Sequence, residues 1–216
     1  MDTPQPTGSS AANATSAAHA KLAQSLAEQA ASLLQNTGSL LPLSASASVA
    51  VIGAAADCNA SLPTSNPSWW CNTFCGCLSG GGGSGAVAPS WVTPILAAVR
   101  ARSSSSNITY SDGRNVQAAV GAAAAADVTL VIVVAGSGVD RNGAALPADQ
   151  LVYLKAVATA GTKTAVLVMA PGAVLIDWVP QVDAILSMWM PGQGQGTAAA
   201  RFLFGDVSPS GTVPDW

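Results

Sequence analysis

Charged side chains are scarce in this chain of 216 residues, at 9% of the total, where globular proteins average about a quarter. Eight basic and eleven acidic residues leave a net charge of −3, and no run of Lys or Arg occurs. Because proteins that bind nucleic acid need clustered basic residues to neutralise phosphates, we expect no nucleic-acid partner. Half of the residues are hydrophobic, which is ample for one domain with a substantial core.

The chain also lacks a clean hydrophobic run long enough to predict a membrane span. The most apolar window, 116–135, contains Asp127 near its middle, and a central aspartate costs roughly 2.5–3.5 kcal/mol on insertion scales. We therefore expect no membrane partner. The first 16 residues show no apolar signal core. Residues 1–17 are predicted to be a disordered tail, and residues 18–216 one domain.

Residues for hydrolytic chemistry are few. A serine triad would require His19, the only histidine, and no G-x-S-x-G nucleophile elbow follows a predicted strand. Glycoside hydrolysis normally uses two carboxyl groups, but the sequence contains a single glutamate, Glu28. Its position in the first predicted helix indicates a solvated helical charge. The sequence therefore predicts no complete hydrolytic site within this chain.

The four cysteines lie close together, at Cys58, Cys71, Cys75 and Cys77. Their spacing departs from the paired C-x-x-C pattern of zinc sites, so disulfides are favoured over free thiols or a metal. Glycosylation sequons begin at Asn13, Asn59 and Asn107. With the cysteines, they favour an extracellular or secretory location.

A glycine-rich run, 80–85, raises the possibility of a phosphate-binding loop. Such a loop follows a strand and carries either a Lys-Ser/Thr pair or G-x-G-x-x-G spacing. The run follows the cysteine-rich segment and has neither feature. The sequence therefore predicts a flexible turn and no cofactor.

The order of hydrophobic segments predicts an α/β fold: a three-layer α/β/α sandwich around a mostly parallel sheet of about six strands. Buried strands are expected at 48–54 and 128–135, a short strand at 108–110, and further strands at 164–169 and 184–189. Helices are expected at about 21–35, 91–102, 115–126, 147–160, 172–180 and 196–204.

Ligands of such sheets gather at the carboxyl ends of the strands. The segments that leave strands there follow Ala54 or span 136–146, 170–172 and 190–193. Asp140 and Arg141 lie in the second of these and are typical either of a clamp on sugar hydroxyls or of a structural ion pair. Trp69, Trp70 and Trp91 are candidates for stacking on sugars, although core packing competes with that role.

Several motifs in order resemble the second domain of family 3 glycoside hydrolases, which include β-glucosidases and β-xylosidases. The resemblance covers about 20–214 and rests on segments 26–36, 38–43, 49–53, 82–87, 92–94, 138–141, 146–150, 191–193 and 204–211. It implies the sandwich fold, a glycoside ligand and a partner catalytic barrel that carries the aspartate nucleophile. Family members often read Glu-Gly-x-Asp-Arg in the active-site loop. Here Ser137 stands at the position of the acid/base glutamate, and serine has no carboxyl proton to give a leaving group.

The resemblance therefore implies the accessory half of a β-glycosidase that is inactive alone. The alternative is a stand-alone module that binds carbohydrate or another protein. In the first case, the face formed by loops 57–89 and 136–146 is expected to expose apolar groups, with Trp69, Trp70 and Phe74 foremost.

Overall fold

A computed structural model describes residues 8, 15–57, 79–80, 89–104, 107–135 and 143–213. A six-stranded sheet lies at its centre, with strand order β1-β6-β5-β4-β2-β3. The strands are β1 (Ser32–Asn36), β2 (Val49–Ile52), β3 (Ile108–Ser111), β4 (Val128–Val134), β5 (Lys163–Met169) and β6 (Ala184–Trp189). All neighbouring strands run parallel except β1, which pairs antiparallel with β6. The predicted mostly parallel sheet is confirmed.

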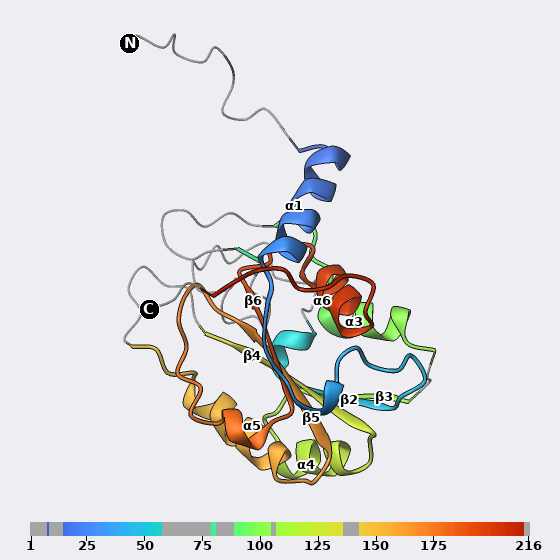
Figure 1. Ribbon diagram of the computed structural model, residues 1–216, viewed down its shortest axis with the longest axis vertical. Coiled ribbons are helices and arrows are strands. Elements are labelled where there is room, and N and C mark those ends of the chain that lie inside the picture. Colours follow the sequence, from blue (N-terminus) through green and yellow to red (C-terminus); the bar gives the residue numbers. More distant parts are fainter. Residues whose placement is uncertain are drawn as a thin grey trace.

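Helices cover both faces of the sheet, so the predicted three layers are confirmed (Figure 1). Helix α3 (Ile95–Arg102) and helix α6 (Gln195–Leu203) cover one face, and the end of α1 (Ala17–Ala30) joins them. Helix α4 (Val116–Ala124) and helix α5 (Ala148–Ala158) cover the other. Short 3-10 helices, η1 (Thr37–Ser39), η2 (Ala54–Ala56) and η4 (Val179–Gln181), lie in the connections.

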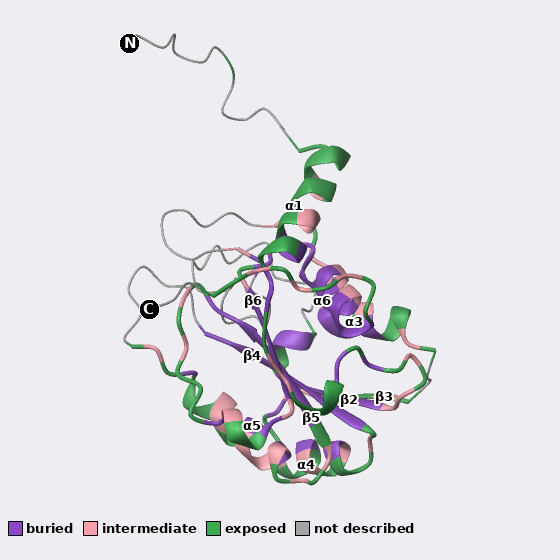
Figure 2. Cartoon of the chain, in the orientation of Figure 1, coloured by how far each residue is buried: buried purple, intermediate pink, exposed green. Residues whose placement is uncertain are grey.

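Strands β2, β4, β5 and β6 are buried on both faces because their side chains alternate between two cores. In β4, Leu130 and Ile132 contribute to the core under α3 and α6, and Val131 and Val133 to the core under α4 and α5. Figure 2 shows this continuous burial through the central strands. The hydrophobic run that ends the membrane-like window of the sequence is therefore a central strand. Within the described residues, no helix has the length and apolar character needed to cross a membrane.

The first predicted helix, 21–35, is wrong in its last third, 31–35. Helix α1 ends at Ala30, and the following residues form β1. Pairing with β6, from Ser32 opposite Ser187 to Asn36 opposite Ala184, satisfies the backbone and outweighs the helical spacing of the leucines. The side chain of Asn36 then binds both backbone groups of Leu41 and holds the turn after the strand.

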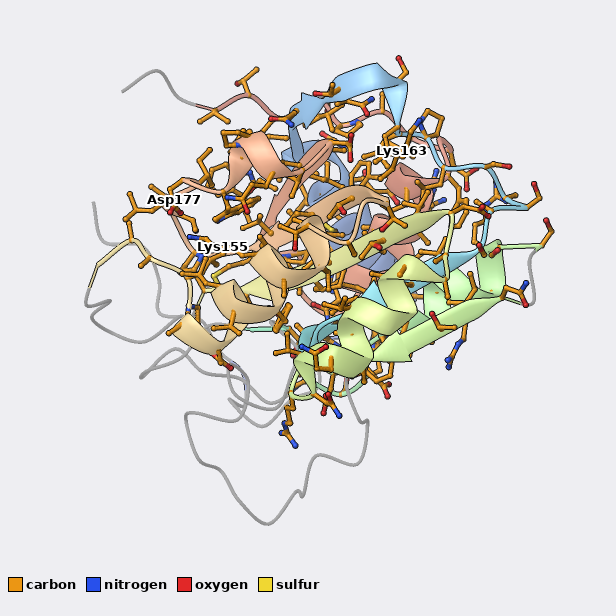
Figure 3. The ribbon with its side chains drawn as sticks, turned by 90° about the horizontal axis from the view of Figure 1, so that it is seen from below. Lys155, Lys163 and Asp177 are labelled. Carbon is orange, nitrogen blue, oxygen red and sulfur yellow. The ribbon has the colours of Figure 1, made fainter. Side chains whose placement is uncertain are left out.

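The helix predicted at about 172–180 is also wrong, because only the short η4 forms there. The segment is tied to its surroundings instead: the backbone N–H of Leu175 donates to the carbonyl of Ala144, and Trp178 is fully buried. Lys155 of α5 forms an ion pair with Asp177 at 3.2 Å, and Figure 3 shows these two side chains together, away from Lys163. These contacts fix the segment against α5 without a regular helix.

Candidate functional site

The carboxyl ends of β2, β4, β5 and β6 lie at one edge of the sheet, because these strands are parallel and adjacent. We call this the carboxyl edge. The chain leaves the strands here at Gly53, Ala135, Ala170 and Met190. The prediction that these four connections share an edge is confirmed, and this edge is the candidate site.

The side chains predicted to act there lie outside the described residues. These are Ser137, Asp140 and Arg141 of the active-site loop, Trp69, Trp70 and Phe74, and the cysteines Cys58, Cys71, Cys75 and Cys77. Their roles stay predictions. The described residues give the frame from which the loops 58–88 and 136–142 leave the sheet, apart from the short described piece at 79–80.

The end of β4, immediately before the active-site loop, is held by two side chains of α5. The side-chain oxygen of Gln150 accepts from the N–H of Val134 at 2.7 Å, and its amide nitrogen donates to the carbonyl of Val134 at 3.0 Å. The hydroxyl of Tyr153 donates to the carbonyl of Ile132 at 2.9 Å. Strand β2 pairs with β4 only as far as Val131, so these side chains satisfy backbone groups beyond its end.

Gly53 permits this arrangement. Its φ is +120°, and an added Cβ would collide with the carbonyl oxygen of Ile132 and lie 3.1 Å from the hydroxyl of Tyr153. A residue with a side chain would therefore disturb both the strand end and the tyrosine. Burial, and to a lesser degree Asp149 and Tyr110, raises the pKa of Tyr153. The hydroxyl consequently keeps its proton and remains a donor.

The end of β6 joins the start of α3 through Gln193. Its side-chain amide donates to the carbonyl of Trp91 at 2.9 Å, and its own carbonyl accepts from the N–H of Thr93 at 2.9 Å. Gly196 comes so near the same segment that a Cβ would collide with the carbonyls of Thr93 and Pro94. Pro191-Gly-Gln193 thus positions Trp91, which is 42% exposed.

Backbone geometry also changes sharply where β6 ends. Trp189 has a φ of +53°, which is uncommon for a residue with a bulky side chain. It pairs with Met169 after a shift in register, and its carbonyl accepts from the N–H of Ala170 at 3.0 Å. The half-buried tryptophan therefore marks the point at which the chain turns out of the sheet toward Met190.

Glu28 is not the solvated charge that its helical position predicts. It is 9% exposed, and its carboxylate accepts from Gln24 at 2.8 Å and from Arg201 of α6 at 2.9 Å. The ion pair joins α1 to α6, and Gln24 also contacts the position of Gly194 beside the carboxyl edge. The sequence could not show this, because the partner is 173 residues away.

No group of three or more His, Cys, Asp or Glu side chains that could hold a metal occurs in the described ranges. His19 is exposed on α1, where its backbone N–H donates to the hydroxyl of the helix-capping Ser16. The described frame therefore supplies hydrogen-bonded anchors and exposed aromatic surface, while the predicted chemical groups belong to the loops that it holds.

The fold places the chain among three-layer α/β/α sandwich domains whose connections meet at the carboxyl edge of a parallel sheet. Comparison with known sequences then identifies the family within that class. The family model for the glycosyl hydrolase family 3 C-terminal domain matches residues 31–215. This match spans most of the chain and includes all six strands that the structure describes. The chain therefore belongs to the glycosyl hydrolase family 3 C-terminal domain family.

The relatives that it matches are much longer proteins. Probable beta-glucosidase L of Aspergillus terreus is 33% identical over 222 aligned positions, which cover 96% of this chain and 30% of that protein. Probable beta-glucosidase L of Emericella nidulans is 31% identical, with the same coverage of both chains. The chain thus spans about 30% of the length of these relatives.

Solved structures agree with this result. The beta-D-glucoside glucohydrolase of Trichoderma reesei matches with a TM-score of 0.78 and 31% identity, over 89% of this chain and 29% of that one. A family 3 beta-glucosidase of Neurospora crassa matches with a TM-score of 0.81 and 29% identity, over 90% and 25%. The likeness covers about nine tenths of this chain and 25–29% of each larger enzyme.

Proposed function

We propose that this chain acts as the second domain of a β-glycosidase that hydrolyses O-glycosyl bonds. In this role it covers and shapes a glycoside site on a catalytic barrel, and it hydrolyses nothing alone. The observation that carries the proposal is the family match over 31–215, set against β-glucosidase relatives of which the chain spans about 30%. Its partners are then a family 3 barrel and a glycoside.

The distribution of carboxyl groups supports inactivity of the isolated domain. Retaining and inverting glycosidases normally need an acid/base and a second carboxylate on opposite sides of the scissile bond. The only glutamate of the sequence, Glu28, joins α1 to α6 through Arg201. By resemblance, the acid/base position holds Ser137. Asp140 and Arg141 would then contact sugar hydroxyls without transferring a proton.

A secretory route and disulfides among Cys58, Cys71, Cys75 and Cys77 are part of the same proposal. Their support is the cluster of cysteines and the three sequons in the sequence. The division into a tail, 1–17, and a domain, 18–216, stays a prediction from the sequence.

A second candidate function is a module that binds carbohydrate through its own surface. Trp91 favours it, because this side chain is 42% exposed and its backbone is fixed by Gln193. An exposed aromatic ring on a fixed backbone can stack on the apolar face of a sugar. Weak binding of cello-oligosaccharides by the isolated chain, lost in Trp91→Ala, would support this candidate.

A chimera tests the primary proposal. Residues 31–215 would replace the matched segment of the Trichoderma reesei enzyme, and hydrolysis of aryl β-glucosides would be measured. We expect a folded chimera of low activity, in which Ser137→Glu raises kcat because general acid catalysis contributes on the order of 10²–10⁴-fold. The matched control is Ser46→Glu, at an exposed turn before β2.

Two results would contradict the proposal. One is a chimera whose sandwich unfolds independently of the barrel, since a second domain packed on the barrel should share its unfolding transition. The other is Ser137→Glu with no more activity than Ser46→Glu, which would show that residue 137 does not occupy the acid/base position.

A further inference from the structure

The sequon Asn107-Ile-Thr109 lies at an accessible edge of the fold. Asn107 immediately precedes β3, which is an edge strand that pairs only with β2. Asn107 and Thr109 are both exposed. Ile108, between them, packs against the core under α3 and α6. Because side chains alternate along an extended backbone, the amide of Asn107 and the hydroxyl of Thr109 lie on the same face, away from that core.

The backbone at this sequon is fixed by the sheet. The carbonyl of Asn107 accepts from the N–H of Val49 at 3.1 Å, and Ile108 is in register with Val49. A group attached to Asn107 would therefore leave from a defined point on the surface. Its attachment requires no opening of the core, since the acceptor side chain is already exposed.

A hollow of about 250 Å³ adjoins the acceptor amide. It is lined by Ser48, Asn107, Ile108, Thr109, Ala125 and Ala126. Two hydroxyls and one amide thus alternate with small apolar side chains, a mixture that suits the polar edge and apolar face of a sugar ring. The first sugar of a glycan on Asn107 would have a surface on which to lie.

We propose that Asn107 is an N-glycosylation site. The donor is an oligosaccharide linked through pyrophosphate to a lipid. The C1–O bond of its first N-acetylglucosamine breaks, a bond forms from C1 to the side-chain nitrogen of Asn107, the lipid pyrophosphate leaves, and the amide loses one proton. No oxidant or reductant takes part.

The position of the site makes a glycan compatible with the proposed function. The start of β3 lies at the amino edge of the sheet, because β3 runs parallel to β2, so it is opposite the carboxyl edge where the candidate site lies. A glycan there would leave the carboxyl edge open. It would also cover the outer side of β3, and shielding an edge strand suppresses pairing with a second chain.

The test uses the full chain behind a cleavable signal peptide, secreted by a yeast, with a reporter sequon of known use appended at the C-terminus. Asn13→Gln and Asn59→Gln remove the other natural sequons. We expect Asn107 to carry glycan, which peptide-N-glycosidase in heavy-oxygen water converts to a labelled aspartate at residue 107. Asn107→Gln and Thr109→Ala should abolish the label, and Thr109→Ser should retain it.

The reporter separates failure at Asn107 from failure to enter the secretory pathway. Molecules with a glycosylated reporter and an unmodified Asn107 would overturn the proposal. So would a label that persists in Thr109→Ala, because modification would then not depend on the sequon. The inference rests on the secretory route that belongs to the proposed function, but neither readout uses glycosidase activity, so failure at Asn107 is distinguishable from failure of the proposed glycosidase role.

Discussion

The two hydrogen-bonding side chains of α5 that hold the end of β4 give the sharpest prediction about the candidate site. Gln150→Met keeps the side-chain length but removes both contacts to the backbone of Val134. Val134 is 5% exposed, so its N–H and carbonyl would lose their partners in a nearly dry environment. Each buried polar group left unpaired costs about 1–3 kcal/mol, so the two groups together predict a loss of about 2–6 kcal/mol in the free energy of unfolding.

Tyr153→Phe is the milder companion change. It removes only the hydroxyl that donates to Ile132 and keeps the packing of the ring. We expect a loss of about 1–3 kcal/mol, the cost of leaving one buried group, the carbonyl of Ile132, without its partner. The two residues satisfy neighbouring groups of one strand, so the double variant need not be additive.

Urea unfolding followed by circular dichroism measures both losses, and amide hydrogen exchange reports on Val134 directly. Gln29→Met is the matched control, because Gln29 is exposed on α1 and its side-chain amide donates to the hydroxyl of Ser25 at the surface; a change within about 0.5 kcal/mol is expected there. If Gln150→Met is no more destabilising than Gln29→Met, and exchange at Val134 is unchanged, then α5 does not hold the strand end.

Three further predictions concern other parts of the chain. Gly53→Ala should destabilise the fold by roughly 2–4 kcal/mol, because φ is +120° and the new Cβ meets the carbonyl of Ile132. The control is Gly121→Ala in α4, which has open space around it and should be neutral or stabilising by up to about 1 kcal/mol. Thermal melts compare the two variants, and equal midpoints would refute the steric argument. The N–H and, secondarily, the hydroxyl of Ser48 donate to the carboxylate of Asp127 and lower its pKa. The stabilisation of the fold by this carboxylate is therefore present above its unfolded pKa of about 3.9 and is lost as pH falls through the folded pKa. Asp127→Asn should flatten this part of the curve of stability against pH, and an unchanged curve would count against the interaction. Mass spectrometry without reduction should show the loss of about four hydrogens from two disulfides, with Cys75 and Cys77 each joined to Cys58 or Cys71, and four freely alkylated thiols would contradict this.

Much of the fold follows from the sequence because its strongest signals are local. The β-branched runs around Val131 and Val166 are buried strands as predicted, and the helix boundaries of α4 and α5 differ from the expected ones by few residues. The errors occur where a distant partner decides. Residues 32–36 leave a helical pattern to pair with β6, and 172–178 are held by contacts to Ala144 and α5.

The frame of the candidate site was predictable only in part. Parallel strands imply that their ends share an edge, and Gly53 after a buried strand signals a close approach of backbone. The hydrogen bonds of Tyr153 and Gln193 were not predictable, because each depends on which segment lies opposite in three dimensions. The one available signal for Tyr153 was its spacing from Gln150: the two polar side chains lie three positions apart, on one face of a helix that follows a strand.

The measurement that tests the central claim most directly is hydrolysis of nitrophenyl β-glucoside and β-xyloside by the purified chain alone. The chain belongs to a C-terminal domain family and spans about 30% of its β-glucosidase relatives, and we propose that it lacks both the nucleophile and the acid/base group. We therefore predict no turnover above buffer, together with a folded sandwich by circular dichroism. Turnover that survives repurification and disappears in Asp140→Asn would contradict the account, because it would place a complete hydrolytic site within this domain.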